Sequence, residues 1–195
     1  MGRASKLANL LTATGLVDLA SKITGVLPTA NAPSGSIVTM ESRKIDYNLS
    51  TTASAFTTLQ TYSFTKKRAD TKVIIHLELT AIGTSASNLT GDTDLALALL
   101  RDGATYVDHQ GTSSYNSLHY NKAFWSTDTD WNYAVSGSRA YMRMAISSTL
   151  EESGVAAGAH TYALQASLAN GSDTLWVNKL PNTAQSRITF MEVVP

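Results

Sequence analysis

The 195-residue sequence contains no cysteine. Disulfide bonds therefore cannot stabilise the protein, and metal sites built on thiolates are excluded. Secreted modules of this size often carry disulfides. The composition thus fits a chain that folds in a reducing cytoplasm, even if it later acts outside a cell.

Charge is scarce as well. Asp, Glu, Lys and Arg make up 15% of the residues and the formal net charge is zero, whereas roughly 25% is typical of soluble proteins. The longest run of like charge, Lys66-Lys67-Arg68, is expected in a solvated turn, because a phosphate-binding surface needs a wider basic face. Nucleic acid and anionic membrane are therefore not expected as partners.

No apolar run approaches the roughly 18–20 residues of a membrane helix, so membrane insertion is not expected. The N-terminus does not satisfy a signal-peptide pattern, because Asn9 and Thr12 interrupt its apolar stretch. Common catalytic motifs are missing, and the four histidines lack metal-ligand spacing. We therefore expect no enzyme activity, no cofactor and no metal site. His76 and His160 are expected to be packed or hydrogen-bonded within strands.

Ser and Thr are abundant, at about a quarter of the residues, and suit exposed strand surfaces. From residue 36 onward the apolar residues follow a period near two, as in Val73, Ile75, Leu77 and Leu79. Many short strands with turn residues between them predict an all-β sandwich or barrel. The expected strands are 36–42, 45–48, 56–64, 72–81, 93–101, 105–107, 122–125, 140–147, 160–168, 174–177 and 187–194.

The first 35 residues are predicted to form a separate arm and linker, partly helical and partly extended, ahead of a domain spanning 36–195. Helix-like apolar spacing continues on both sides of Gly15, and Pro28 and Pro33 mark the linker. The arm is too short to form its own core. Its apolar residues must therefore dock on the body, on other copies or on a larger assembly, and we expect these to form an anchor or trimer interface: Leu7, Leu10, Leu11, Leu16, Leu19, Ile23, Val26 and Leu27.

The stretch 106–133 is rich in aromatic residues with carboxylates between them. Flat rings beside polar groups are suited to sugar recognition, but the same rings could fill the core or a threefold interface. The candidate glycan- or receptor-binding residues are Tyr120, Trp125, Asp128, Asp130 and Trp131. The Asp-x-Asp pairs at 92–94 and 128–130 are expected to be polar turns rather than calcium sites, because neither continues into an EF-hand pattern.

Three segments resemble virion proteins of tailed bacteriophages. The segment KITGVLPTAN at 22–31 is similar to short motifs of phage tail fibres, and GRASKLANLL at 2–11 is similar to the start of small phage structural proteins. The segments HTYALQA at 160–166 and RITFMEV at 187–193 resemble the C-terminal C1q/TNF-like jelly roll of trimeric fibre and head-decoration proteins. No extended repeat shaft is present, which favours a compact decoration protein over a long fibre.

This resemblance implies a homotrimeric capsid decoration, or cement, protein on the virion surface, assembled in the host cytoplasm. The arm would attach to the major capsid protein or another virion protein, and a jelly-roll β-sandwich would project outward. The alternative is the receptor- or glycan-binding tip of a tail fibre, for which a host surface glycan is the expected partner.

Overall fold

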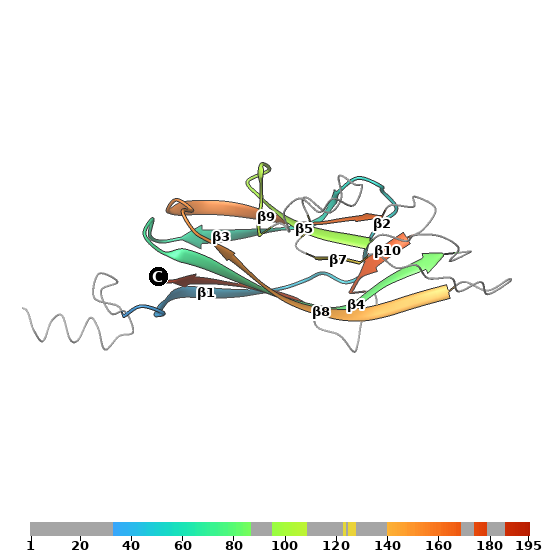
Figure 1. The fold of residues 1–195 in the computed structure, drawn as a ribbon, viewed down its shortest axis with the longest axis horizontal. Helices are drawn as coiled ribbons and strands as arrows, with labels where there is room; N and C mark the ends of the chain where they lie inside the picture. The colour runs from blue at the N-terminus through green and yellow to red at the C-terminus, as the bar shows by residue number, and fades with distance from the viewer. Residues whose placement is uncertain are drawn as a thin grey trace, which may run out of the picture.

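The computed structural model describes residues 33–86, 95–108, 123, 125–127, 140–168, 174–178 and 186–195. This part of the chain is all-β, as the sequence predicts (Figure 1). Its strands are β1 (Ile37–Lys44), β2 (Leu49–Thr51), β3 (Thr57–Lys66), β4 (Lys72–Ala86), β5 (Leu95–Arg101), β6 (Thr105–Tyr106), β7 (Trp125–Thr127), β8 (Ala140–Glu152), β9 (Gly158–Leu168), β10 (Thr174–Val177) and β11 (Arg187–Val193). Within the described part, no helix is long and apolar enough to cross a membrane.

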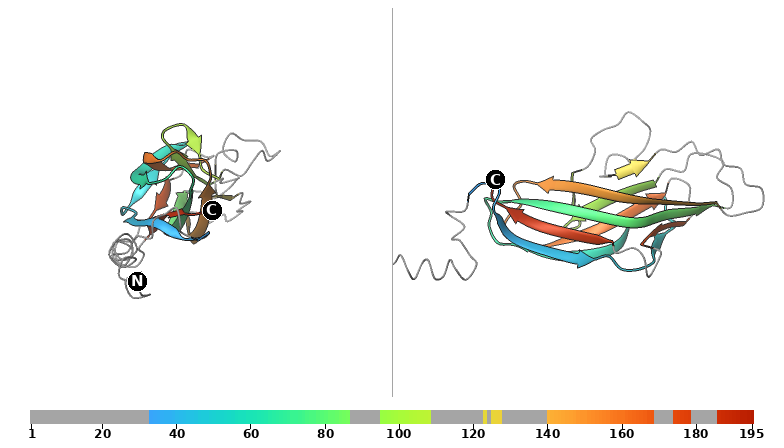
Figure 2. Two further views of the ribbon diagram at one scale, coloured as in Figure 1. Left: turned by 90° about the vertical axis from the view of Figure 1, so that its left-hand side faces the viewer. Right: turned by 90° about the horizontal axis from the view of Figure 1, so that it is seen from below.

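The strands form two antiparallel sheets. In the larger sheet, β11 lies between β1 and β4, while β8 pairs with the other side of β4. β10 pairs with the far end of β4, and β2 pairs with β10. Figure 2 (right) shows β1, β11, β4 and β8 side by side in blue, red, green and orange. In the smaller sheet, β9 lies between β3 and β5, and β5 also pairs with β6 and β7.

Four of the strand pairs are nested along the sequence. β1 pairs with β11, β3 with β9, β4 with β8, and β5 with β7. Each outer pair therefore encloses the next, and successive pairs alternate between the two sheets. Contacts between residues far apart in sequence hold the fold together, because the first strand pairs with the last.

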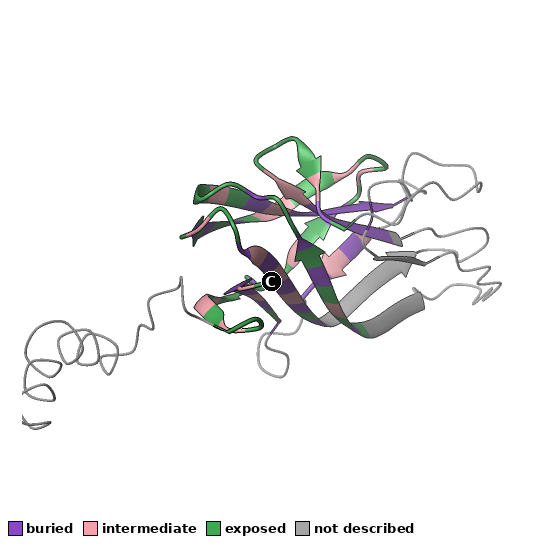
Figure 3. Ribbon diagram, turned by 60° about the vertical axis from the view of Figure 1, so that its left-hand side comes forward, coloured by how far each residue is buried: buried purple, intermediate pink, exposed green. Residues whose placement is uncertain are grey.

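The core lies between the sheets. The predicted alternation in β4 is confirmed, since Val73, Ile75, Leu77 and Leu79 are fully buried; Figure 3 shows the alternating burial along the strands. Phe190 of β11 packs at the centre, with ring centroids 5.2 Å from Phe64 and 4.9 Å from Tyr162. Burial of such residues, at roughly 25 cal/mol per Å² of apolar surface, is the main favourable term in the stability of the body.

Strand positions agree well with the sequence analysis, with informative exceptions. The expected strand at 45–48 is wrong: Ile45 is buried in the core, Asn48 has φ 60°, and the strand begins at Leu49. The positive φ at Asn48 makes a turn here. β4 and β8 extend to Ala86 and Glu152, beyond the expected ends, because they pair with each other over almost their whole length.

The burial of β9 departs from simple alternation. Tyr162, Leu164, Ala166 and Leu168 are buried in the core, yet the alternate residues Gln165 and Ser167 are also buried. β9 is the middle strand between β3 and β5, and the Gln165 side chain donates a hydrogen bond of 3.1 Å to Thr58 Oγ1. Alternation of residue types therefore predicts which β9 residues face the core, but not that Gln165 and Ser167 on the other face are also buried.

Candidate functional site: an apolar groove beside the arm

The outer face of the larger sheet has an apolar half and a polar half. Residues on this face are register partners across β1, β11, β4 and β8. The apolar half consists of Ile37, Met40, Ile74, Met191 and Val193. The polar half consists of Ser42, Lys44, His76, Glu78, Ser147, Thr149, Arg187 and Thr189. Strand alternation places all of these side chains away from the core.

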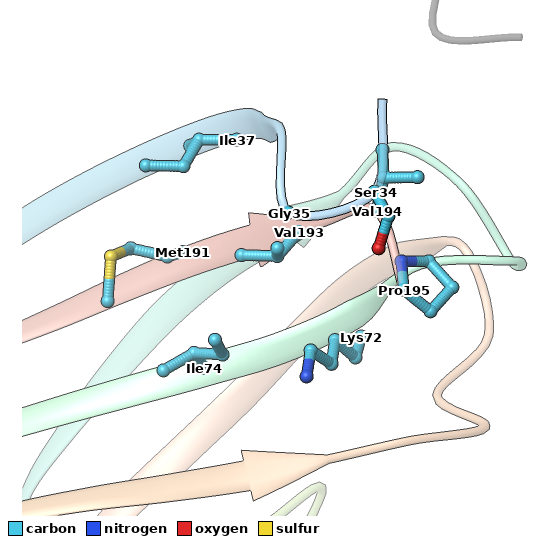
Figure 4. A pocket seen from close by; sticks show the side chains of 9 residues that line it. All are labelled: Ser34, Gly35, Ile37, Lys72, Ile74, Met191, Val193, Val194 and Pro195. Carbon is cyan, nitrogen blue, oxygen red and sulfur yellow. The ribbon is translucent and has the colours of Figure 1, made fainter. Parts of the chain in front are cut away.

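A groove of about 360 Å³ lies in the apolar half (Figure 4). Its walls are Ile37, Ile74, Met191 and Val193, with Lys72 and the last residue, Pro195, at its margin. Ile37 is 56% exposed and the neighbouring Met40 60% exposed. Single exposed apolar residues are normal, but adjacent ones around a groove are typical of an interaction site.

The N-terminal end of the described chain lies at this groove. Ser34 and Gly35 line it, directly before β1. Ser36 N–H donates to Pro33 O at 3.0 Å and Gly35 has φ 84°, which are the features of a type II turn. Gly35 N–H also donates to Val194 O at 2.8 Å. This hydrogen bond ties the turn to the residue after β11, so the chain enters β1 at a defined position.

Side chains of the polar half bond to one another. The His76 Nδ1 atom lies 3.1 Å from Thr149 Oγ1, and the Thr189 hydroxyl donates to Ser42 Oγ at 3.1 Å. The Lys72 ammonium pairs with Glu151 at 3.0 Å beside the groove, on the β8 side of the apolar half. His76 is thus hydrogen-bonded in a strand, as the sequence analysis expects. These contacts leave the polar half suited to water, in contrast to the groove.

Beneath the groove, a buried carboxylate fixes the chain. Glu192 lies on the inner face of β11 and is fully buried. It accepts hydrogen bonds from the backbone N–H groups of Lys67 and Arg68, both at 2.8 Å, and from the Thr71 hydroxyl at 2.7 Å. Backbone N–H groups satisfy a buried carboxylate well. Glu192 therefore ties the β3–β4 turn to the strand that forms the groove floor.

The expected solvated turn at Lys66-Lys67-Arg68 is only partly right. Lys67 and Arg68 do lie in the turn, but Lys66 ends β3 with 1% exposure. Its ammonium donates to the backbone oxygen of Arg68. Burial lowers the pKa of Lys66, opposed by the charges of Glu192 and Asp70. Lys67 donates its backbone N–H to Glu192, and the Arg68 side chain pairs with Asp70. The expectation that this run is not a phosphate site stays a prediction.

A second polar cluster joins β5, β8 and β9. Glu152 is buried and accepts hydrogen bonds from Arg101 at 2.6 Å and from the Tyr162 hydroxyl at 3.0 Å. Burial, together with the Glu152 charge, raises the pKa of Tyr162 above its usual range. The neighbouring Glu151 points to the outer face, as expected for adjacent strand residues. Every member is paired with another, so the cluster is best explained as a structural support.

His160 and Asp102 connect this cluster to the turn after β5 and to the turn before β9. His160 Nδ1 lies 2.8 Å from Asp102 Oδ2, and its Nε2 lies 2.9 Å from Ala156 O. Burial alone would raise the pKa of Asp102, but hydrogen bonds from His160 and the backbone N–H of Thr161 outweigh it and lower that pKa. Both histidines in described strands are therefore hydrogen-bonded. Among the described residues, no group of three His, Asp or Glu is placed to hold a metal ion.

Most residues singled out from the sequence lie outside the described part. These are the arm residues Leu7, Leu10, Leu11, Leu16, Leu19, Ile23, Val26 and Leu27, and the aromatic-region residues Tyr120, Asp128, Asp130 and Trp131. The backbone of Trp125 begins β7 and pairs with Leu97 of β5. The division at residue 35, the anchor and the glycan site remain predictions.

The sequence analysis did not identify the groove. A usable signal was present, because Ile74 stands among Lys72, His76 and Glu78 at the outward positions of a predicted strand. Met40 and Met191 are also apolar at outward positions. Only the pairing of β1 with β11 and of β11 with β4 brings these residues together, over separations of more than 100 residues.

Comparisons with known proteins give little guidance. No known family and no curated protein matches the chain. Among solved structures, a chain from the structure of infectious bursal disease virus Gx strain is similar over 88% of this chain and 44% of its own length, with 14% identity and a TM-score of 0.24. The chain thus spans less than half the length of that viral protein. A likeness at this level bears on neither the fold nor the function.

Proposed function

We propose that this protein is a non-enzymatic structural component of a virion, a homotrimeric capsid decoration protein on the virion surface. Its body would be a jelly roll, and its N-terminal arm would attach to the major capsid protein or another virion protein. The observation that carries the proposal is the groove at residues 34–37: an exposed apolar surface adjoins the point where the predicted apolar arm joins the β-body.

The nested strand pairing supports the jelly-roll part of the proposal. A jelly roll has eight strands in two sheets with Greek-key connections. Four nested antiparallel pairs, joined by the pairings of β11 with β4 and of β9 with β5, give the order β1-β11-β4-β8 in one sheet and β3-β9-β5-β7 in the other. The arm leads into the first strand of this arrangement.

The physical role would be mechanical. An arm that buries apolar surface on a capsid gains roughly 25 cal/mol per Å². Three arms linked in one trimer act together, since after one binds the others have a high effective concentration. Such a protein would raise the free energy needed to separate neighbouring capsid subunits, and the buried polar clusters would keep the body rigid.

The test uses the full chain and particles of the virus that encodes it, or shells made from the capsid protein of the same genome. Wild-type protein should sediment as a trimer of 20.8-kDa chains and pellet with the particles. The variant Leu10→Asp/Leu11→Asp should keep the folded body but lose particle binding. Particle binding that survives this change would refute the anchoring role, and a monomeric wild type would refute the trimer.

A further inference from the structure

We propose that the edge of β1 that faces away from β11 pairs with the same edge of a second copy, antiparallel and about a twofold axis at Ser42. The larger sheets of the two copies would then continue into one sheet. This contact uses the β-body and not the arm. It is therefore compatible with a trimer formed through the arms, and it does not rest on the virion role.

One side of β1 is open to a further strand. β1 is the outermost strand of the larger sheet, and none of the described strands pairs with the side away from β11 (Figure 2, right). Ile45 N–H donates to Ser186 O at 3.0 Å, toward β11. Because hydrogen-bonding direction alternates along a strand, the backbone groups of Met40, Ser42 and Lys44 point to the open side. A strand added there would gain backbone hydrogen bonds.

The exposed large apolar side chains of the described body gather at this strand. Ile37 and Met40 of β1 are more than half exposed, and so is Tyr47, which follows shortly after its end. No other large apolar side chain of the described part is classed with them as exposed. An antiparallel copy brings the end of one β1 beside the start of the other. It would therefore direct Tyr47 of each copy toward Ile37 of the other.

The charges on β1 select the position of the axis. Glu41 and Arg43 lie on the same face and form an ion pair at 2.5 Å. An axis at Ser42 places Glu41 of each copy opposite Arg43 of the other, and opposite charges across neighbouring strands attract. An axis at Glu41, Arg43 or Lys44 would instead place like charges directly opposite each other, which is destabilising.

The same register uses the open backbone groups of β1. Ser42 pairs with Ser42 of the copy, and Met40 of each copy pairs with Lys44 of the other. Each such pair exchanges both of its N–H···O bonds. The aliphatic part of Lys44 can cover Met40 while its ammonium stays in water. An axis at Met40 would leave Glu41 and Arg43 without charged partners and place the bulge near the start of β1 inside the new ladder.

Self-complementarity favours a second copy over an unrelated strand. Edge strands are commonly protected against pairing by lysine, by inward-pointing charges or by proline. β1 contains no proline and carries one charge of each sign on either side of Ser42. A twofold contact uses this pattern twice, once in each direction. An unrelated extended peptide would match the backbone, but it would need its own charges at the same positions.

Disulfide trapping can test the pairing, because the sequence has no native cysteine. Ser42→Cys places the two thiols at the axis, where the Cα atoms of a hydrogen-bonded pair lie about 5.5 Å apart, within the range of a disulfide. The matched control is Ser147→Cys, an exposed outward serine on β8 at the opposite edge of the sheet. Under mild oxidation of the full chain, Ser42→Cys should form disulfide-linked dimers about tenfold faster than Ser147→Cys. Non-reducing electrophoresis measures both rates.

Two charge variants test the register. In the Ser42→Cys protein, adding Glu41→Arg makes both charges positive, and adding Arg43→Glu makes both negative. Each variant alone should dimerise about tenfold more slowly, since like charges then face each other. A mixture of the two restores opposite charges across the axis but not within either chain. Trapping should therefore return as mixed dimers, which mass spectrometry of the linked peptides identifies.

Three results would overturn the proposal. Equal trapping of Ser42→Cys and Ser147→Cys would show that β1 does not pair with its copy. Charge variants that trap as fast as Ser42→Cys, or that are not rescued by mixing, would exclude the axis at Ser42. Trapping seen only after Leu10→Asp/Leu11→Asp is added would show that the arm occupies the edge. We expect those arm changes to leave trapping unchanged, so failure here and failure of the virion role are distinguishable.

Discussion

The two halves of one sheet face obey the same strand geometry but have opposite chemistry. In the polar half, His76 and Thr189 find partners on neighbouring strands, at 3.1 Å in each case. Two residues along the same strands, Ile74 and Met191 lie on this face near Ile37 and Met40. Ile37 and Met40 are more than half exposed. Alternation in a sandwich ordinarily places polar residues outward. The difference makes the apolar half, and not the polar half, the candidate interaction surface of this face.

The largest expected effect comes from the core beneath both halves. Phe190→Ala should reduce the free energy of unfolding by about 3–5 kcal/mol, because it empties the centre of the aromatic cluster. The adjacent Met191→Ala, on the outer face, should cost about 1 kcal/mol or less. Urea unfolding of both variants measures the contrast. Similar losses would mean that Met191 is as much a core residue as Phe190.

A carboxylate on each face provides the next comparison. Glu192→Gln should lower the free energy of unfolding by about 2–3 kcal/mol, because an amide cannot accept from all three donors at this buried site. Glu151→Gln breaks an exposed ion pair with Lys72 and should cost less than about 0.5 kcal/mol. Chemical denaturation again gives both values. A small effect at Glu192 would show that the β3–β4 turn does not need this tie.

A charge placed in each half tests whether the apolar half is an interaction surface. Met40→Lys/Ile74→Lys should lower binding of an apolar fluorescent dye several-fold, because the charges disrupt the exposed apolar surface. Ser42→Lys/His76→Lys changes the next outward residues on the same strands and should leave dye binding unchanged. Fluorescence titration measures the binding of the dye. Equal binding by both variants would remove the distinction between the halves.

Acid should weaken polar contacts and spare apolar ones, with the smallest expected effect. The pKa of Asp102 is lowered in the folded protein. A carboxyl group of this kind stabilises the fold at pH values above its unfolded pKa, and that contribution is lost as pH falls through the folded value. Melting temperature should therefore decline below about pH 4, and less steeply in Asp102→Asn. Parallel declines in the two proteins would assign acid sensitivity to other carboxylates.

Local patterns were sufficient to locate most strands but not their ends. Apolar residues at every second position in 72–79, and the turn residues between segments, predicted β4 and its neighbours. The extension of β8 to Glu152 depends on its register with Val73, which no local pattern contains. The strand expected at 45–48 was wrong because Asn48 adopts a positive φ and Ile45 enters the core.

The candidate site was less predictable than the fold. Lys66 looked like part of a solvated basic turn, yet its side chain is buried and bonded within the turn. No sequence pattern singles out Glu192, yet it accepts three hydrogen bonds from a turn more than 120 residues earlier. Such roles depend on which turn meets which strand, and the sequence pattern carries no record of that.

The sequence by itself predicted an all-β body over 36–195 and excluded disulfides, because composition and two-residue periodicity act locally. It also predicted that the apolar residues among the first 35 need a surface to cover them. Only the tertiary structure placed an exposed apolar surface beside the start of β1. Pairing of the first strand with the last brings Ile37 and Met40 beside Met191 and Ile74, and this groove forms because those distant strands meet.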